Sequence, residues 1–143
     1  MREALREAGY AAAEDEVPIG AVIVWNGRVI AKGHNMTERL ADPTAHAEMI
    51  AITAATEAVG GKYLNDCTLY VTVEPCPMCA GAIYQARISK VVFGADDLKG
   101  GALGGNFDMY KEKLNHYPNV VKNVLKDECS TIITNYFKAK RNK

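Results

Sequence analysis

The sequence has little of what marks a membrane, secreted or polyanion-coating protein. Its longest apolar stretch, Pro18 to Trp25, has about eight residues, whereas a membrane-spanning helix needs about 20. Charged residues occur within Met1 to Glu7, where a secretory signal would have an apolar run. Basic and acidic side chains both number 17, so no net charge attracts a polyanion. These absences argue against a spanning or exported protein and predict a cytoplasmic one.

No internal repeat, low-complexity tract or linker divides the chain. At 143 residues, 48% hydrophobic and 24% charged, it has the size and composition of one globular domain that needs no disulfide bonds. We therefore expect a single domain over residues 1–143. Only four cysteines are present. Without an export signal, the three-residue spacing of Cys76 and Cys79 favours metal or redox chemistry.

The pattern of apolar residues, glycines and prolines predicts alternating helices and strands. Asn26-Gly27 is a strong signal for a tight hairpin turn. The stretch 45–59 is apolar on nearly every side and is expected to be a buried helix. The order of elements predicts a three-layer α/β domain, a sheet covered by helices. The predicted helices are 2–14, 45–59, 75–87 and 127–140, and the predicted strands are 19–25, 28–32, 68–73, 88–93 and 119–124.

Two short motifs carry chemistry. His46, Cys76 and Cys79 offer one imidazole and two thiolates, the three protein ligands with which a catalytic zinc site leaves a fourth position for water. Glu48 could accept a proton from that water. On a regular helix Glu48 and His46 would face roughly opposite sides. The pair therefore lies at an irregular first turn, or Glu48 approaches from another side; the spacing leaves both open.

Each motif alone has simpler interpretations. A His-x-Glu pair is usually a surface or capping feature, and Cys-x-x-Cys can be a redox pair or half of a structural zinc site. A four-cysteine site would also need Cys67 and Cys129, which we expect to pack as small apolar side chains. The combination of His-x-Glu with Pro-Cys-x-x-Cys, however, is the signature of zinc-dependent nucleobase deaminases.

The surrounding residues extend the signature into a resemblance. Residues 42–48, 68–82 and 91–95 are similar to those of the bacterial tRNA-specific adenosine deaminases, within the cytidine/deoxycytidylate deaminase superfamily, and the likeness runs from about residue 1 to 141. It implies a cytidine-deaminase-like α/β/α fold with a central mixed five-stranded sheet flanked by helices. It also implies hydrolytic conversion of adenosine to inosine at the wobble position of a tRNA anticodon.

The resemblance assigns roles to individual residues. His46, Cys76 and Cys79 would hold one Zn²⁺ per subunit, which activates the water that attacks C6 of adenine, while Glu48 shuttles the proton. A tRNA anticodon stem-loop is the implied partner, and a homodimer is the implied assembly. The apolar stretch 80–86 is a candidate dimer contact, but helix packing within one domain would produce the same pattern. The residues implied to contact or orient the substrate are Asn35, Val17, Ile19, Ala47, Val73, Pro75, Asp97, Tyr136 and Phe137.

The sequence also allows other functions. A free-base or nucleoside deaminase, acting on guanine or cytosine, could use the same zinc core, and Glu74-Pro75-Cys76 would suit it equally. A non-catalytic zinc scaffold is a rival from another class, but it would have no use for Glu48. Four of the last six residues are basic, Lys138, Lys140, Arg141 and Lys143. They form either a helix end suited to the macrodipole or an edge that contacts phosphates.

Overall fold

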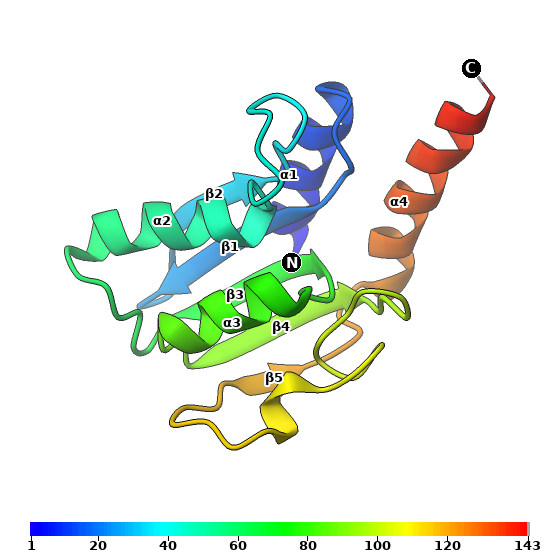
Figure 1. Cartoon of the computed structure of the whole chain (residues 1–143). Helices are drawn as coiled ribbons and strands as arrows, with labels where there is room; N and C mark the ends of the chain where they lie inside the picture. The colour runs from blue at the N-terminus through cyan, green and yellow to red at the C-terminus, as the bar shows by residue number, and fades with distance from the viewer. Residues whose placement is uncertain (143) are drawn as a thin grey trace.

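A mixed five-stranded sheet forms the centre of the computed structural model, which describes residues 1–142 (Figure 1). The strand order is β2-β1-β3-β4-β5. β1 pairs antiparallel with β2 and with β3, whereas β4 runs parallel to β3 and β5. The strands are β1 (Gly20–Trp25), β2 (Arg28–His34), β3 (Thr68–Val73), β4 (Lys90–Ala95) and β5 (Asn119–Val121).

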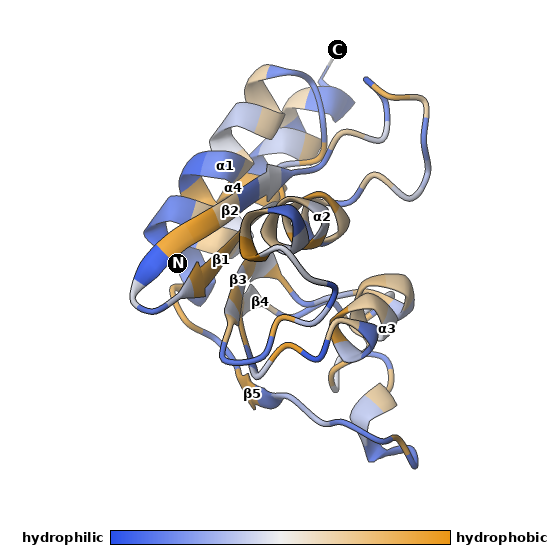
Figure 2. Cartoon of the chain, turned by 90° about the vertical axis from the view of Figure 1, so that its left-hand side faces the viewer, coloured by the Kyte–Doolittle hydropathy of each residue, from blue (hydrophilic) through white to orange (hydrophobic). Residues whose placement is uncertain are grey.

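Helices cover both faces of this sheet. In Figures 1 and 2, α1 and α4 lie on one side of the strands and α2 and α3 on the other. The main apolar core fills the space between the sheet and the α2–α3 layer. The expected three-layer α/β/α architecture with a mixed five-stranded sheet is therefore confirmed. The helices are α1 (Arg2–Ala13), α2 (Ala47–Val59), α3 (Pro77–Gln85) and α4 (Lys126–Arg141), with a short 3₁₀ helix, η1 (Met109–Lys111).

Glycines in the strands let the helices pack closely on the sheet. A Cβ at Gly33 in β2 would lie 2.5 Å from the Ala47 carbonyl oxygen and 2.9 Å from the Ala51 amide nitrogen, both in α2. Gly20 in β1 faces α1 in the same way, against Ala4 and Ala8. The first turn of α2 can therefore lie directly on β2.

The strand boundaries differ from the predicted ones where other contacts take over. β4 begins at Lys90, because the Ile88 amide bonds to the Ile83 carbonyl at the end of α3. β5 ends at Val121, and the next residues turn away through Asn123, whose φ of 66° is incompatible with a strand. β2 extends to His34, two residues beyond the predicted end.

The sequence predicted that the helix at 45–59 is buried on nearly every side. In the structure, only one side of α2 is buried. It begins at Ala47, and its buried residues are Ala47, Glu48, Ala51 and Ala55, which form the side that meets the sheet. The other side has no second layer above it and remains partly exposed, Ile52 included. High apolar content therefore overstated the burial of this helix.

Within the described part of the chain, no helix is both long and apolar enough to cross a bilayer.

Candidate active site

Three potential metal ligands meet where two helices begin. His46 is the residue immediately before α2, Cys76 is the residue immediately before α3, and Cys79 lies in the first turn of α3. The His46 Nδ1 atom is 3.6 Å from the Cys76 Sγ and 3.5 Å from the Cys79 Sγ. All three ligand atoms lie within 4.8 Å of one another, so this group could hold a metal ion.

The backbone at His46 explains how Glu48 reaches the same place. His46 is extended, with φ −79° and ψ 154°, so it is outside the helix and the 100° rotation per helical residue does not apply to it. Glu48 is the second residue of α2 and is only 4% exposed. Its carboxyl group hydrogen-bonds with Cys79. Of the two possibilities that the sequence left open, the irregular helix start is the observed one.

The electrostatics of the cluster favour proton exchange and metal capture. Burial raises the pKa of Glu48 from its ordinary 4.5 to about 7. A hydrogen bond from Cys79, together with His46, lowers the pKa of Cys76 to about 4, whereas the hydrogen bond to Cys76 and burial raise the pKa of Cys79. The lowered pKa of Cys76 favours its thiolate form, and a bound cation would displace the proton of Cys79.

The ligand spacing fits a tetrahedral metal. With zinc–nitrogen and zinc–sulfur bonds of about 2.0 and 2.3 Å, a tetrahedral angle separates nitrogen from sulfur by about 3.5 Å. The two observed nitrogen–sulfur distances agree with this value. Two thiolates and one imidazole match the soft-to-borderline donors that zinc prefers, and three ligands leave a fourth position open.

The remaining cysteines do not join the cluster. Among the described residues, the only group of this kind consists of His46, Cys76 and Cys79. Cys67 is buried at the start of β3, and Cys129 is buried in α4, on the opposite face of the sheet and against Gly94. The four-cysteine alternative is therefore not supported, and both residues pack as small apolar side chains, as expected.

Five of the residues that the resemblance linked to substrate line one cavity of about 450 Å³. Four parts of the chain meet there: the segment before β1, the end of β3, the segment after β4, and α4. Val73 is three residues before Cys76, so the strand that lines the cavity leads directly to a ligand. The cavity is lined by Val17, Ile19, Val73, Ala95, Asp96, Asp97, Ser130, Ile133, Thr134 and Phe137.

Tyr136 does not share this cavity with Phe137. The two rings contact each other edge to face at 5.3 Å, but Tyr136 turns toward the segment after α1 and lines a neighbouring cavity. Its hydroxyl donates to the Asp15 carbonyl oxygen at 3.2 Å. Val17 borders both cavities, so they adjoin.

The other three implied substrate residues lie around the start of α2 and the end of β3. Asn35 follows β2, is 6% exposed, and donates its backbone N–H to the Ile19 carbonyl at 3.1 Å. Ala47 is fully buried at the first position of α2. The Pro75 carbonyl accepts the Ala102 N–H at 2.9 Å.

Two buried glutamates organise the loops around the site, and the sequence alone did not predict this role. Glu74 is 3% exposed and Glu16 is 1% exposed. Their carboxylates accept hydrogen bonds from backbone amides of distant loops, at residues 97–105 for Glu74 and at residues 38–39 for Glu16. Glu74 was noted only as part of a motif. The available signal was a glutamate in an otherwise apolar stretch, followed later by a glycine-rich loop.

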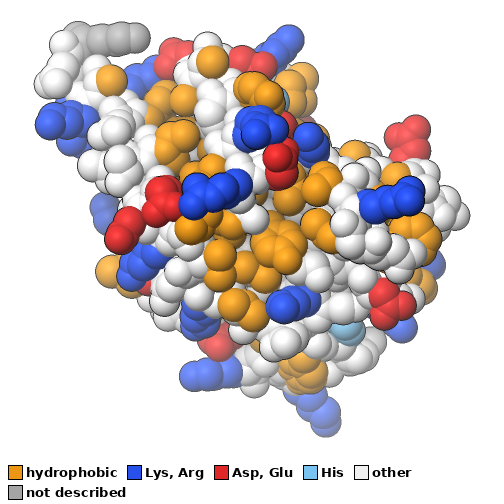
Figure 3. Space-filling view, turned by 180° about the vertical axis from the view of Figure 1, so that it is seen from behind, with side chains coloured by type: hydrophobic (Ala, Val, Ile, Leu, Met, Phe, Trp, Pro, Cys, Tyr) orange, Lys and Arg blue, Asp and Glu red, His pale blue; other side chains and the backbone are white. Residues whose placement is uncertain are grey.

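The basic C-terminal segment is partly neutralised. Lys140 lies 2.9 Å from an Asp15 carboxylate oxygen and 5.6 Å from the centre of the Tyr136 ring. Lys138 and Arg141 lie in the last turn of α4, where cations suit the helix dipole, and Lys143 is outside the described residues. Figure 3 shows Lys and Arg side chains interspersed with Asp and Glu on the face seen from behind, rather than one basic patch.

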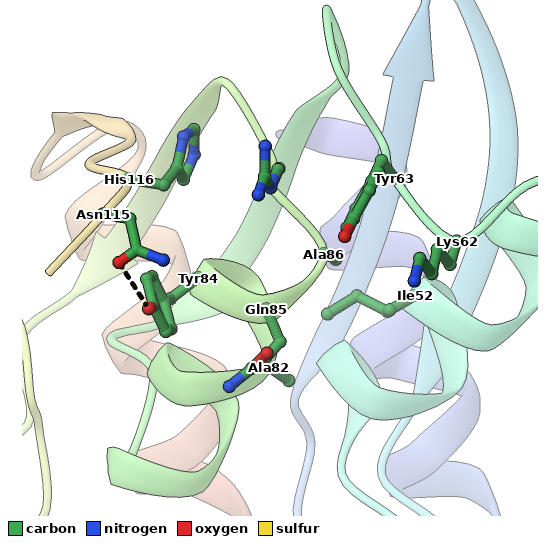
Figure 4. A pocket seen from close by; sticks show the side chains of 10 residues that line it. Ile52, Lys62, Tyr63, Ala82, Tyr84, Gln85, Ala86, Asn115 and His116 are labelled. Atoms are coloured by element: carbon green, nitrogen blue, oxygen red, sulfur yellow. Dashed lines mark hydrogen bonds between the residues drawn. The ribbon is translucent and has the colours of Figure 1, made fainter.

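A third groove lies away from the ligand cluster. Its volume is about 550 Å³, and Figure 4 shows side chains around it from α2, the segment after α2, the C-terminal part of α3 and the loop before β5. Tyr84 donates to the Asn115 side chain at 3.3 Å, and the Arg87 guanidinium lies 4.6 Å from the Tyr63 ring centre. The candidate ligands begin these helices at the other end, so this groove is not part of their site.

A buried carboxylate beside a His/Cys/Cys group, on a sheet sandwiched by helices, is the arrangement of a hydrolytic deaminase. The comparison with known families agrees, because the family model of the MafB19-like deaminases matches residues 1–141.

Close relatives narrow the class. The chain is 48% identical over its whole length to a tRNA-specific adenosine deaminase of Bacillus subtilis, of which it covers 89%. A solved structure from work on A-to-I editing by tRNA:A34 deaminases superposes with a TM-score of 0.88 at 46% identity, over 92% of this chain and 96% of that one. The chain therefore belongs to the tRNA-specific adenosine deaminase family.

Another branch of the superfamily is more distant in structure. The guanine deaminase of Bacillus subtilis is 38% identical, with a TM-score of 0.66 over 99% of this chain and 91% of that one.

Proposed function

We propose that this protein deaminates adenosine to inosine at the wobble position of a tRNA anticodon. The observation that carries the proposal is the buried Glu48 carboxyl beside His46, Cys76 and Cys79, in a chain whose close relatives are named tRNA-specific adenosine deaminases. The reaction adds water at C6 of adenine and releases ammonia. It needs a nucleophile, a proton shuttle and a cavity that holds an extruded base.

We propose that the ligand cluster holds one Zn²⁺ per subunit. The nitrogen–sulfur distances and the donor set support this metal. When bound, zinc supplies a water of lowered pKa that is a good nucleophile at neutral pH. The protein contributes the two helix starts, which present the ligands to one point.

Glu48 performs the proton transfers in this proposal. Its carboxylate takes one proton of the attacking water and gives it to the adjacent ring nitrogen. It then takes the remaining hydroxyl proton at C6 and delivers it to the departing amine, which leaves as ammonia. A pKa of about 7 suits a group that must accept and donate in the same cycle. Burial, which raises this pKa, also keeps bulk water from competing for the proton.

The cavity of Val17, Ile19 and Val73 is the proposed receptor for the nucleoside and the neighbouring nucleotides. These three would form its apolar wall. Asp97 and Phe137 line the same cavity, and the proposal assigns ribose contact to Asp97 and base stacking to Phe137. The remaining proposed contacts are the Asn35 amide, the backbone at Ala47 and Pro75, and, from the neighbouring cavity, Tyr136.

A tRNA anticodon stem-loop is the proposed partner. With no excess of positive charge and with Lys140 already paired, the protein would bind RNA largely through shape and stacking. The basic end of α4 would add a modest phosphate contact. The cytoplasmic location expected from the sequence would follow from this substrate.

We also propose a homodimer of single-domain subunits, each formed by residues 1–143. The outer side of α2 and α3 supports this assembly, because Ile52, Met78 and Ala82 remain partly exposed there with no layer above them. The groove of Figure 4 lies on the same side. Burial of these apolar side chains by a second copy would stabilise the dimer.

A guanine deaminase is the second candidate, favoured by the 38% identical structure. One experiment decides between them. An anticodon stem-loop with adenosine at the wobble position is incubated with the zinc-loaded enzyme, in parallel with free guanine, cytosine and adenosine, and inosine or free-base product is measured. We expect inosine in the stem-loop, none with Glu48→Ala, and inert free bases. Turnover of guanine with an unmodified stem-loop would refute the tRNA proposal.

A further inference from the structure

The carboxylate of Glu74 is the centre of a hydrogen-bond network beside the substrate cavity. Glu74 directly follows β3 and is 3% exposed. Its Oε1 accepts the Asp97 N–H at 3.1 Å, and its Oε2 accepts the N–H groups of Leu103 at 2.8 Å and Gly105 at 2.9 Å. Within the described residues it forms no ion pair with a lysine or arginine. Its buried charge is balanced by backbone amides alone.

The loop is built around this carboxylate. A Cβ at Gly101 or at Gly105 would overlap the Glu74 side chain and the Asp97 carbonyl. Both positions therefore require glycine for a close approach, not for an unusual φ. The glycine-rich composition of this stretch is explained by the buried carboxylate that it encloses.

The same loop carries Asp97 to the wall of the substrate cavity. Asp97 lines that cavity, and its Oδ1 accepts the N–H groups of Lys99 at 3.1 Å and Gly100 at 3.0 Å. The orientation of the Asp97 side chain thus depends on the loop backbone. Since Glu74 holds the Asp97 amide, it determines where the loop starts relative to the cavity.

The network also joins the loop to the metal-ligand segment. Glu74 is followed by Pro75, whose carbonyl accepts the Ala102 N–H at 2.9 Å, and then by Cys76. Val73, on the other side of Glu74, lines the cavity. In the run 73–76, the first residue therefore lines the cavity, the second anchors the loop, the third makes another loop contact, and the fourth is a candidate ligand.

We propose that Glu74 is a positioning residue that fixes Asp97 relative to the ligand cluster and thereby sets how tightly the enzyme binds the RNA around the target adenosine. This inference rests on the proposed tRNA deamination. Glu74 does not touch the reacting atoms. Its contribution is expected in KM for the stem-loop and not in kcat or in metal binding.

The variant Glu74→Gln tests this with almost no change in volume. An amide has one acceptor oxygen where the carboxylate has two, so its NH₂ group must oppose at least one of the three N–H donors. With the oxygen kept toward Leu103 and Gly105, the lost bond is the one to Asp97. We expect KM for the anticodon stem-loop to rise about tenfold, kcat to change by less than about threefold, and one equivalent of zinc to remain.

A double-mutant cycle shows whether the effect passes through Asp97. If it does, adding Glu74→Gln to Asp97→Ala raises KM no further than Asp97→Ala alone. Glu16→Gln is the matched control, because Glu16 is another buried carboxylate that accepts two backbone amides, those of Glu38 and Arg39. Any KM effect of Glu16→Gln should add to that of Asp97→Ala. Additive KM effects for Glu74→Gln, or a fall in kcat with loss of zinc, would overturn the proposal.

A measurement that needs no substrate separates this inference from the proposed function. Amide hydrogen exchange over residues 97–105 should be faster in Glu74→Gln than in the unmodified protein, and unchanged in Glu16→Gln. If the unmodified enzyme left the stem-loop intact, the proposed function would fail, and the exchange data would still decide whether Glu74 anchors the loop. Unchanged exchange over this segment would refute the anchor itself.

Discussion

The ligand cluster and the proposed substrate cavity are linked by the short segment from Val73 to Cys76, but they are built in different ways. The cluster takes all its side chains from two helix starts, His46 and Glu48 at α2, and Cys76 and Cys79 at α3. The cavity takes its lining from four separate segments, two of them loops and one the terminal helix. The cluster is largely enclosed, whereas Phe137 at the cavity is 42% exposed.

This difference separates chemistry from recognition. A ligand set displayed by two helices on a common sheet has little freedom to vary, because each displacement alters a coordination distance. A cavity whose walls come from loops and a helix can change its shape without disturbing the ligands. We therefore expect substitutions in the cluster to affect metal content and kcat, and substitutions in the cavity to affect KM.

The largest effect should follow removal of a ligand. Cys79→Ala leaves two protein ligands, so bound zinc should fall far below one equivalent and stem-loop deamination should become undetectable. Cys67→Ala is the matched control, since Cys67 is also a buried cysteine but lies outside the cluster. It should retain its zinc and activity with a lower thermal midpoint. Metal analysis of the purified proteins checks this, and equal loss of zinc from both would contradict the assignment.

Removal of the proton shuttle comes next. Glu48→Gln preserves shape but cannot exchange a proton, so kcat should fall by about 10²–10⁴-fold. Zinc content and KM should change little, because Glu48 is not a proposed ligand. Steady-state kinetics with the stem-loop, combined with metal analysis, measure both. Activity within tenfold of the unmodified enzyme would assign proton transfer to another group.

A smaller effect is expected in the cavity. Phe137→Ala removes a proposed stacking surface, and stacking of a base on an aromatic side chain contributes about 1–3 kcal/mol, so KM should rise about 5- to 160-fold with a small change in kcat. Phe107→Ala is the control, since Phe107 has a similar exposure, 44% against 42%, but does not line the cavity. Equal changes in the two variants would remove the distinction between this cavity and the general surface.

The smallest effect concerns pH and the segment that leads to His46. The Asp42 carboxylate accepts the N–H and the hydroxyl of Thr44, both at 2.8 Å, and these bonds lower its pKa below the ordinary 3.8. An acid whose folded-state pKa is lowered stabilises the protein above its unfolded-state pKa, and the contribution is lost as pH falls through the folded-state value. The thermal midpoint should therefore decrease slightly below about pH 4, and less so in Asp42→Asn. An identical decrease in both proteins would contradict this role.

The elements that the sequence predicted best were those with a local cause. The Asn26-Gly27 turn, with positive φ at both residues, joins β1 and β2 as expected. The three candidate ligands could be identified because each motif is contiguous, and the structure brings them within 4.8 Å of one another. Strand order and the ends of β4 and β5 could not, since they depend on pairing and on helix-end contacts between distant residues.

Two features of the site could not be predicted from residue types: the bonds from a side chain to distant backbone amides, and the directions in which neighbouring helical side chains point. Nothing in the residue types around Glu74 specifies that its partners are amides of residues 97–105, 23 to 31 positions away. Tyr136 and Phe137 are neighbours in sequence, yet successive helical residues point about 100° apart, and the two line different cavities. The resemblance grouped them together, whereas helix geometry separates them.

Gly33 in β2 limits which substitutions the site can tolerate, because α2 packs directly against it. It is not one of the candidate ligands and lies next to the last residue of β2, but its missing side chain sets how near the first turn of α2 comes to β2. A single methyl group there would push against Ala47, the residue between His46 and Glu48, and move the proton shuttle and a ligand together. Evolutionary drift at this site should therefore be nearly as restricted as at the ligands, although Gly33 takes no part in the reaction.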